Sequence, residues 1–99
     1  MTVNKEAIRA RIEAQEELIV GLYRDDGLCC AIGALLSPAT LDKLDEYGLR
    51  CDVHMNWPVI GPELRAYGLS KAQAQRLQTA NDESDGSKRA VLTVLEKMK

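Results

Sequence analysis

The sequence predicts a mainly α-helical fold, a compact single-domain bundle of five or six short helices over residues 1–99. Three observations predict it. Apolar residues recur at three- and four-residue steps in several stretches, which is the spacing of one helix face. Capping and breaking residues divide the chain at short intervals. One Trp, three Tyr and no Phe leave the core to aliphatic side chains and Met, a composition that suits helices better than a β-sandwich.

The amino-terminal part is expected to form one long amphipathic helix. Thr2 or Asn4 can cap it, and apolar residues recur from Ile8 to Leu22. This pattern predicts about five turns that end near Arg24.

An uncharged stretch from Gly27 to Leu36 is predicted to lie at the centre of the fold. It contains two of the three cysteines and several small residues. After a turn at residues 25–27, we expect a short buried helix that stops at Ser37, because Pro38 disfavours helix at the residue before it. Pro38 can itself occupy the first turn of a helix over residues 38–47.

Residues 49–57 alternate apolar and polar side chains, which is a strand-like period. We expect an extended segment or a short edge strand here, one that can pair with a partner molecule. Breaks are expected at Pro58, Gly61 and Pro62, and a short helix over residues 62–67 should follow.

Two further helices are expected in the last third of the chain. Ser70 can cap a helix over residues 71–80, and a polar turn is predicted over residues 81–87. The final helix carries an apolar stripe over residues 91–98. Its cap is one of three residues, Ser84, Asp85 or Ser87.

The charge balance disfavours direct nucleic-acid binding. The formal net charge is −2 and the pI is about 5.4, whereas phosphate binding needs clustered Lys and Arg. No run of apolar residues approaches the roughly 18 that a spanning helix needs, so no membrane association is expected. No export signal is recognisable and the three cysteines are an odd number. We therefore expect free thiols and a cytoplasmic location.

Two short motifs carry a resemblance. Cys30-Ala31-Ile32-Gly33-Ala34-Leu35 is followed by Leu77-Gln78-Thr79-Ala80-Asn81-Asp82 and then by the apolar helix. This layout resembles a loose group of small bacterial and phage proteins that share a C-x-x-G-A-L helix start and an N-D turn before the last helix. The resemblance implies a small helical fold and a bacterial or phage origin, and it implies no reaction.

Both motifs also have an interpretation that needs no function. Small residues at Cys30 and Gly33 allow another element to approach closely. Asn81 or Asp82 can accept hydrogen bonds from free backbone N–H groups at a helix start. We therefore expect Cys30, Gly33, Asn81 and Asp82 to be structural residues.

Thiol chemistry is the alternative hypothesis. Cys30 or Cys29 would lie in the first turn of a helix, where the pKa of a thiol is lowered. His54 could complete a catalytic arrangement together with Asp82, Asp52 or Asn81. The chain has one His and is short for building a substrate cleft. A non-enzymatic protein is therefore favoured. Catalytic residues would be assigned only if the fold brought a cysteine thiol, the His54 imidazole and the third polar side chain together.

No metal site or cofactor is expected. Cys51-x-x-His54 has the spacing of half a zinc site, but the adjacent Cys29 and Cys30 are poor chelators. Residues 81–86 resemble the start of a calcium loop, yet its twelfth position is Leu92, where a bidentate Glu is needed.

Protein binding is the leading hypothesis. Trp57, Met55, Tyr67 and Tyr47 lie in and around the one segment that is not convincingly helical, and such side chains often anchor interfaces. We expect a stoichiometric binding factor of phage or mobile-element origin that inhibits a host complex such as a CRISPR defence complex. The acidic groups in residues 13–17, 42–46 and 82–85 could mimic nucleic acid. Homodimer formation is left open.

Overall fold

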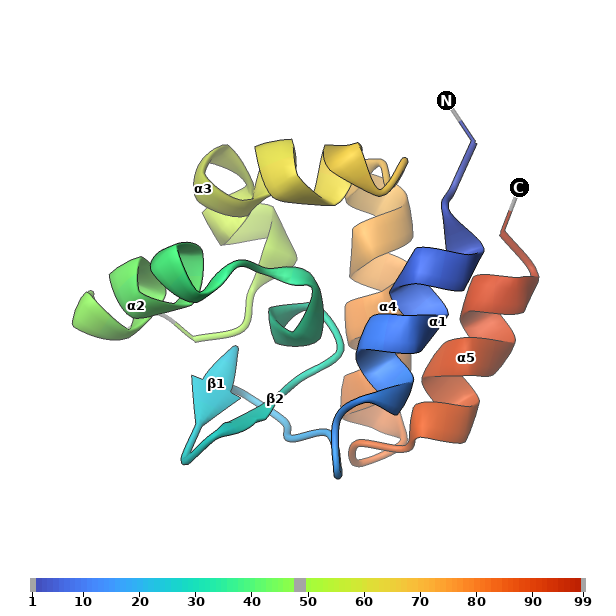
Figure 1. Ribbon diagram of the computed structural model, residues 1–99, viewed down its shortest axis with the longest axis horizontal. Helices are drawn as coiled ribbons and strands as arrows, with labels where there is room; N and C mark the ends of the chain where they lie inside the picture. Colours follow the sequence, from blue (N-terminus) through green and yellow to red (C-terminus); the bar gives the residue numbers. More distant parts are fainter. Residues whose placement is uncertain (1, 48–49, 99) are drawn as a thin grey trace.

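The computed structural model describes residues 2–47 and 50–98 (Figure 1). These residues contain five α-helices, a short 3-10 helix (η1) and a two-stranded antiparallel hairpin. In chain order the elements are α1 Lys5–Glu13, β1 Arg24–Asp25, β2 Leu28–Cys29, η1 Gly33–Leu35, α2 Pro38–Glu46, α3 Val53–Ala66, α4 Lys71–Glu83 and α5 Lys88–Glu96. The Cα radius of gyration is 11.9 Å, as expected for a compact chain, for which about 13 Å is typical at about 100 residues. The compact, mainly α-helical class is confirmed.

Helices α1, α4 and α5 lie side by side, while α2 and the hairpin lie at the other end of the molecule (Figure 1). Each of the three helices buries a stripe of aliphatic residues against the others. The fully buried members are Ile8, Ile12, Ala74, Leu77, Val91 and Leu95. Burying one Leu, Ile or Val side chain contributes about 1.5–3 kcal/mol, so this helix layer is a large part of the core.

The helices begin where capping residues allow them to begin. In each of the five described helices, the residue before the first turn accepts a hydrogen bond from the backbone N–H three positions later. These capping residues are Asn4, Ser37, Asp52, Ser70 and Ser87. In the described part of the chain, every helix is too short or too polar to cross a bilayer.

The predicted long first helix is wrong beyond Glu13. Helix α1 ends there, and Gly21 has a φ of +91°, which a right-handed helix does not permit. Residues 18–23 run instead as an irregular, partly extended segment. The Ile19 N–H donates to the Cys29 carbonyl at 3.1 Å, so this segment packs against β2.

The predicted buried helix in the central stretch is also wrong. Asp26 and Gly27 have φ values of +50° and +81° and form the two-residue turn of the hairpin. The twist of such a turn matches that of the flanking strands, and an Asp-Gly pair favours it because both of its central residues need a positive φ. The chain therefore enters the core extended, and η1 is its only helical turn between Cys29 and Ser37. Burial was predicted correctly, since residues 29–36 are all buried.

The expected extended segment at 49–57 is only partly present. Leu49 lies outside the described residues. Arg50 forms an isolated antiparallel bridge with Leu22, but Val53–Trp57 already belong to α3. These residues form a helix and not a strand for two reasons. The Asp52 side chain caps the helix by accepting the Met55 N–H at 3.0 Å, and buried residues recur at helical spacing from Val53 onward.

Helix α3 continues through the expected breaks at Pro58 and Pro62. The two prolines are four residues apart and both exposed, so they lie on the side of the helix where water can replace the lost backbone bonds. The helix changes direction along its length (Figure 1), as prolines commonly cause. The predicted separate helix at 62–67 is the end of α3.

Helix α4 extends three residues further than the expected end at residue 80. Asn81 and Asp82 therefore lie in its last turn, and the predicted polar turn at 81–87 is shorter. The Gly86 N–H donates to the Asn81 carbonyl at 2.7 Å and closes the helix end. Ser87, one of the three expected caps, begins α5.

Gly33 fits against the backbone of Tyr23. A Cβ at position 33 would lie 1.9 Å from the Tyr23 carbonyl oxygen. The same oxygen accepts a hydrogen bond from the Cys30 N–H at 3.2 Å. No side chain fits there unless the backbone moves. The backbone of η1 can therefore pack this closely against Tyr23 only with glycine at position 33.

Replacement of this glycine is expected to destabilise the fold. Gly33→Ala should lower the free energy of unfolding by about 2–4 kcal/mol, because a methyl group would overlap rigid backbone. Urea denaturation followed by circular dichroism measures the loss. Gly61→Ala is the matched control, because its Cβ would meet the movable Trp57 ring at 3.0 Å. Equal unfolding midpoints for the two variants would contradict this explanation.

Glu63, on α3, binds the start of α2. Its Oε1 accepts the Ser37 N–H at 2.7 Å and its Oε2 accepts the Thr40 hydroxyl. Burial raises the pKa of Glu63, but the hydrogen bonds from Thr40 and Ser37 outweigh burial and hold the pKa below its ordinary value. The charged carboxylate therefore couples α3 to α2.

We expect Glu63→Gln to make stability less dependent on pH. The carboxylate contributes fully above the ordinary pKa of 4.5. The contribution is lost as pH falls through the lowered folded-state pKa, because the unfolded chain binds the proton more readily. Between about pH 7 and about pH 3, the wild type should lose about 1 kcal/mol more than the variant in urea denaturation. Identical losses would show that Glu63 does not couple to folding.

Candidate functional site

Four large apolar side chains are exposed in the described part of the chain. Their exposed fractions are 44% for Val20, 37% for Leu22, 66% for Tyr47 and 72% for Met55. Met55 and Tyr47 were predicted as binding residues, whereas Val20 and Leu22 were not. The Asp26-Gly27 pair could have revealed them, because it predicts a hairpin turn and therefore an extended chain before it. In an extended chain, the apolar side chains of residues 18–23 do not all lie on one buried face, as they would in a helix.

Leu22 and Met55 belong to backbone segments that are joined to each other. The Cys51 N–H donates to the Gly21 carbonyl at 3.0 Å, and Arg50 pairs with Leu22. Met55 lies in the first turn of α3, which follows directly after these residues. We name Val20, Leu22 and Met55 the Met55 surface.

The turn that carries Met55 is held by Gln78 of α4. Gln78 Oε1 accepts the Val53 N–H at 2.8 Å, and its Nε2 donates to the Cys51 carbonyl at 2.6 Å. One amide side chain thus binds the backbone on both sides of Asp52, the cap of α3. The turn is fixed to the layer of α1, α4 and α5.

A buried tyrosine holds the same turn from the other side. The Tyr23 hydroxyl accepts the Asp52 N–H at 3.2 Å and Asn56 Nδ2 at 2.8 Å. Asn56 Nδ2 also donates to the Arg50 carbonyl at 3.0 Å. Burial raises the pKa of Tyr23 well above its ordinary value, so the hydroxyl stays neutral. These contacts fix the backbone on both sides of Met55.

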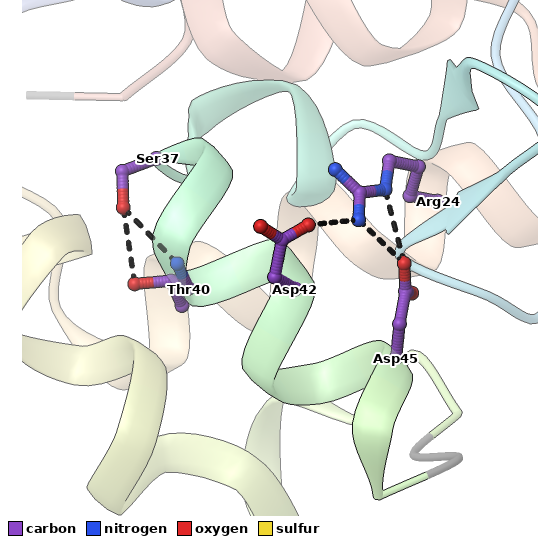
Figure 2. A network of polar contacts seen from close by, with 5 residues as sticks. All are labelled: Arg24, Ser37, Thr40, Asp42 and Asp45. Carbon is purple, nitrogen blue, oxygen red and sulfur yellow. Dashed lines mark hydrogen bonds and ion pairs between the residues drawn. The ribbon is translucent and has the colours of Figure 1, made fainter.

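Arg24 joins the hairpin to α2, as Figure 2 shows. Its guanidinium binds Asp42 Oδ1 and Asp45 Oδ2, each at 2.6 Å. The hydrogen bonds to Asp42 and then Asp45 raise the pKa of Arg24 above its ordinary value. Two members of the acidic group at 42–46 are therefore paired within the protein, and Tyr47 follows them at the end of α2.

The other two predicted binding residues are half-buried. The Trp57 ring covers Gly61, and the Arg65 guanidinium lies 5.6 Å from the ring centroid. Tyr67 lines an open groove of about 420 Å³ together with Arg11, Glu63 and five other residues. Both aromatic side chains pack against the core, so they are less available for contact than Met55.

The structure does not bring His54 to the predicted thiols. His54 is exposed on the first turn of α3, and it forms no hydrogen bond with a cysteine among the described residues. Cys30 is only 1% exposed and its Sγ lies 3.2 Å from Cys51 Sγ. The partner of Cys30 is thus a second thiol, which spacing along the sequence did not reveal.

The two thiols of this pair differ in acidity. The hydrogen bond with Cys51 lowers the pKa of Cys30 against the opposing effect of burial, and the Gly33 N–H adds to the lowering at 3.3 Å. The hydrogen bond with Cys30 and burial raise the pKa of Cys51. Burial also raises the pKa of Cys29. The directions are opposite because the two thiols titrate as a coupled pair, in which the loss of a proton from one sulfur disfavours its loss from the other.

Asn81 and Asp82, the other motif residues, have different surroundings. Asn81 is fully buried, its Oδ1 accepts the Ala31 N–H at 2.9 Å, and its Nδ2 donates to the Ile19 carbonyl at 2.8 Å. Asp82 is half-buried and lies 3.5 Å from Gln78 Nε2. Asn81 therefore binds the start of the C-x-x-G-A-L stretch, and the helix α5 that follows is capped by Ser87 instead.

Within residues 2–47 and 50–98, no three His, Cys, Asp or Glu side chains are grouped as a metal site would require. Cys51 and His54 lie on either side of the cap of α3. The segment that resembles the start of a calcium loop begins inside α4, which continues to Glu83. Comparison of the chain with protein-family models, with curated proteins and with solved structures gave no match.

Proposed function

We propose that this protein is a non-enzymatic binding module that docks on another protein through the Met55 surface. The observation that supports this most is Met55 itself, a large apolar side chain that is 72% exposed on a turn held by Gln78 and Tyr23. Burying such a side chain in a partner's pocket contributes about 1.5–3 kcal/mol. Its unbranched thioether adapts to pockets of different shape.

Order in the free protein favours this use. A loop that must be ordered on binding costs about 0.5–1.5 kcal/mol for each immobilised side chain. The backbone around Met55 is already fixed by hydrogen bonds to Asp52 and Gln78. The backbone therefore needs no further ordering on binding, and only the side chains of the surface lose conformational freedom.

The class of partner is a further part of the proposal. The resemblance to small bacterial and phage proteins suggests a phage or mobile-element factor that acts in the bacterial cytoplasm on a host complex, such as a CRISPR defence complex. Stoichiometric occupation of a host surface needs no catalytic group. It needs a fixed apolar anchor with polar neighbours, and Met55 lies among the exposed residues Arg50, Asp52 and His54.

The thiol-enzyme alternative has weaker support. A nucleophile and its base should lie within hydrogen-bond reach, and His54 has no such contact with Cys30. Cys30 is only 1% exposed, so its sulfur is closed to an organic substrate much larger than a water molecule.

Capture with matched variants tests the proposal. The tagged wild type, Met55→Glu and Thr93→Glu are incubated with bacterial lysates, and retained proteins are identified by mass spectrometry. Thr93 is exposed on α5, in the helix layer away from the hairpin (Figure 1), so it controls for the added charge. We expect one stoichiometric partner with the wild type and Thr93→Glu, and at least a tenfold loss with Met55→Glu, which is about 1.4 kcal/mol.

Circular dichroism should show that both variants are folded, because both substituted side chains are exposed. A partner that binds Met55→Glu as tightly as the wild type would reject the Met55 surface. Absence of any partner, or capture only of further copies of this chain, would reject the proposed class of function.

A further inference from the structure

Two cysteines from distant parts of the chain meet in the core. Cys30 Sγ and Cys51 Sγ are 3.2 Å apart, and the residues are 1% and 8% exposed. Twenty-one positions separate them in the sequence. The contact brings the start of the central stretch next to the segment that leads into α3.

The backbone around both cysteines is fixed independently of the sulfur contact. The Cys30 N–H donates to the Tyr23 carbonyl at 3.2 Å. The Cys51 N–H donates to the Gly21 carbonyl at 3.0 Å, and Gln78 Nε2 donates to the Cys51 carbonyl at 2.6 Å. The two sulfurs therefore face each other because the fold holds them there.

We propose that Cys30 and Cys51 are a modification site, a dithiol that a peroxide converts into an intramolecular disulfide. A disulfide bond is about 2.05 Å long, so the two sulfurs need to approach each other by a little over about 1 Å. Rotation of the two short side chains can supply such a movement while the hydrogen-bonded backbone stays in place.

The reaction balances with one peroxide molecule. The thiolate of Cys30, paired with the Cys51 thiol, attacks one peroxide oxygen and the O–O bond breaks. A sulfenic acid forms on Cys30, and the released hydroxide takes up the proton that Cys30 gave up and becomes water. The Cys51 sulfur then attacks the Cys30 sulfur, the S–O bond breaks, and the hydroxide leaves as water with the proton of the Cys51 thiol. Two thiols lose two electrons in total and hydrogen peroxide gains them, giving one disulfide and two waters.

Cys29 is excluded as the partner by its position. A disulfide between the adjacent Cys29 and Cys30 would strain the backbone, and no hydrogen bond joins Cys29 Sγ to another described sulfur. Cys29 is also buried, at 7% exposure, so it is a matched control of similar accessibility. The inference does not depend on the protein-binding proposal.

Peptide mapping tests the site on the wild-type protein. The native protein is treated with hydrogen peroxide, unfolded, alkylated with iodoacetamide and digested. Before alkylation, the intact mass should be lower by two hydrogen atoms. After digestion, we expect a cross-linked peptide pair that contains Cys30 and Cys51, and an alkylated Cys29. Cys29→Ser should still form the cross-link, and Cys51→Ser should not.

Thermal unfolding gives a second measurement. The cross-link closes a loop around η1 and α2, and a loop of this size should raise Tm by roughly 15 °C. Dithiothreitol should reverse the rise. Alkylation of all three cysteines after peroxide treatment, cross-links that involve Cys29 equally, or dimers joined between chains would each overturn the proposal.

Discussion

The buried amide of Asn81 joins three parts of the chain that lie far apart in the sequence. Asn81 lies on α4. Its side chain accepts a hydrogen bond from the Ala31 N–H, 50 positions away, and donates one to the Ile19 carbonyl, 62 positions away. A buried backbone group without a partner costs about 1–3 kcal/mol. Since both partners lie in irregular chain that no helix or sheet satisfies, this side chain completes their hydrogen bonding.

The arrangement of the hairpin end follows from that interaction. Asn81 fixes the segment before β1 and the segment after β2 to the same helix, so Tyr23 is set against Gly33. Tyr23 and Gln78 in turn hold the residues on both sides of Asp52. The Met55 surface and the contact between Cys30 and Cys51 therefore both depend on how α4 holds the non-helical part of the chain.

Local signals predicted much of the helical part. Ser70 and Pro38 mark helix starts because capping and φ restriction act within a few residues. The failures have two causes, local breaking residues whose signal was outweighed by the apolar pattern and contacts between residues far apart in the sequence. Gly21 and the Asp-Gly turn end helical structure early, and Asp52 with Gln78 starts α3 in a stretch whose alternation resembles a strand.

The same division applies to the candidate site. Met55 and Tyr47 were predicted as binding residues from residue type, and both are exposed. Cys51 could not be assigned to Cys30, because its approach depends on bonds from Gly21 and Gln78 that no spacing along the chain encodes. Asn81 was expected to accept a hydrogen bond from a backbone N–H. Only the tertiary fold shows that this N–H belongs to Ala31.

Urea denaturation of Asn81→Leu tests the central claim most directly. Leucine has a similar volume but neither binds the Ala31 N–H nor the Ile19 carbonyl, so both are left unpaired in the core. We predict a loss of about 2–5 kcal/mol in the free energy of unfolding, or failure to fold, whereas Thr79→Ala on the exposed side of α4 should stay within about 0.5 kcal/mol of the wild type. A stability for Asn81→Leu equal to that of the Thr79→Ala control would contradict the account.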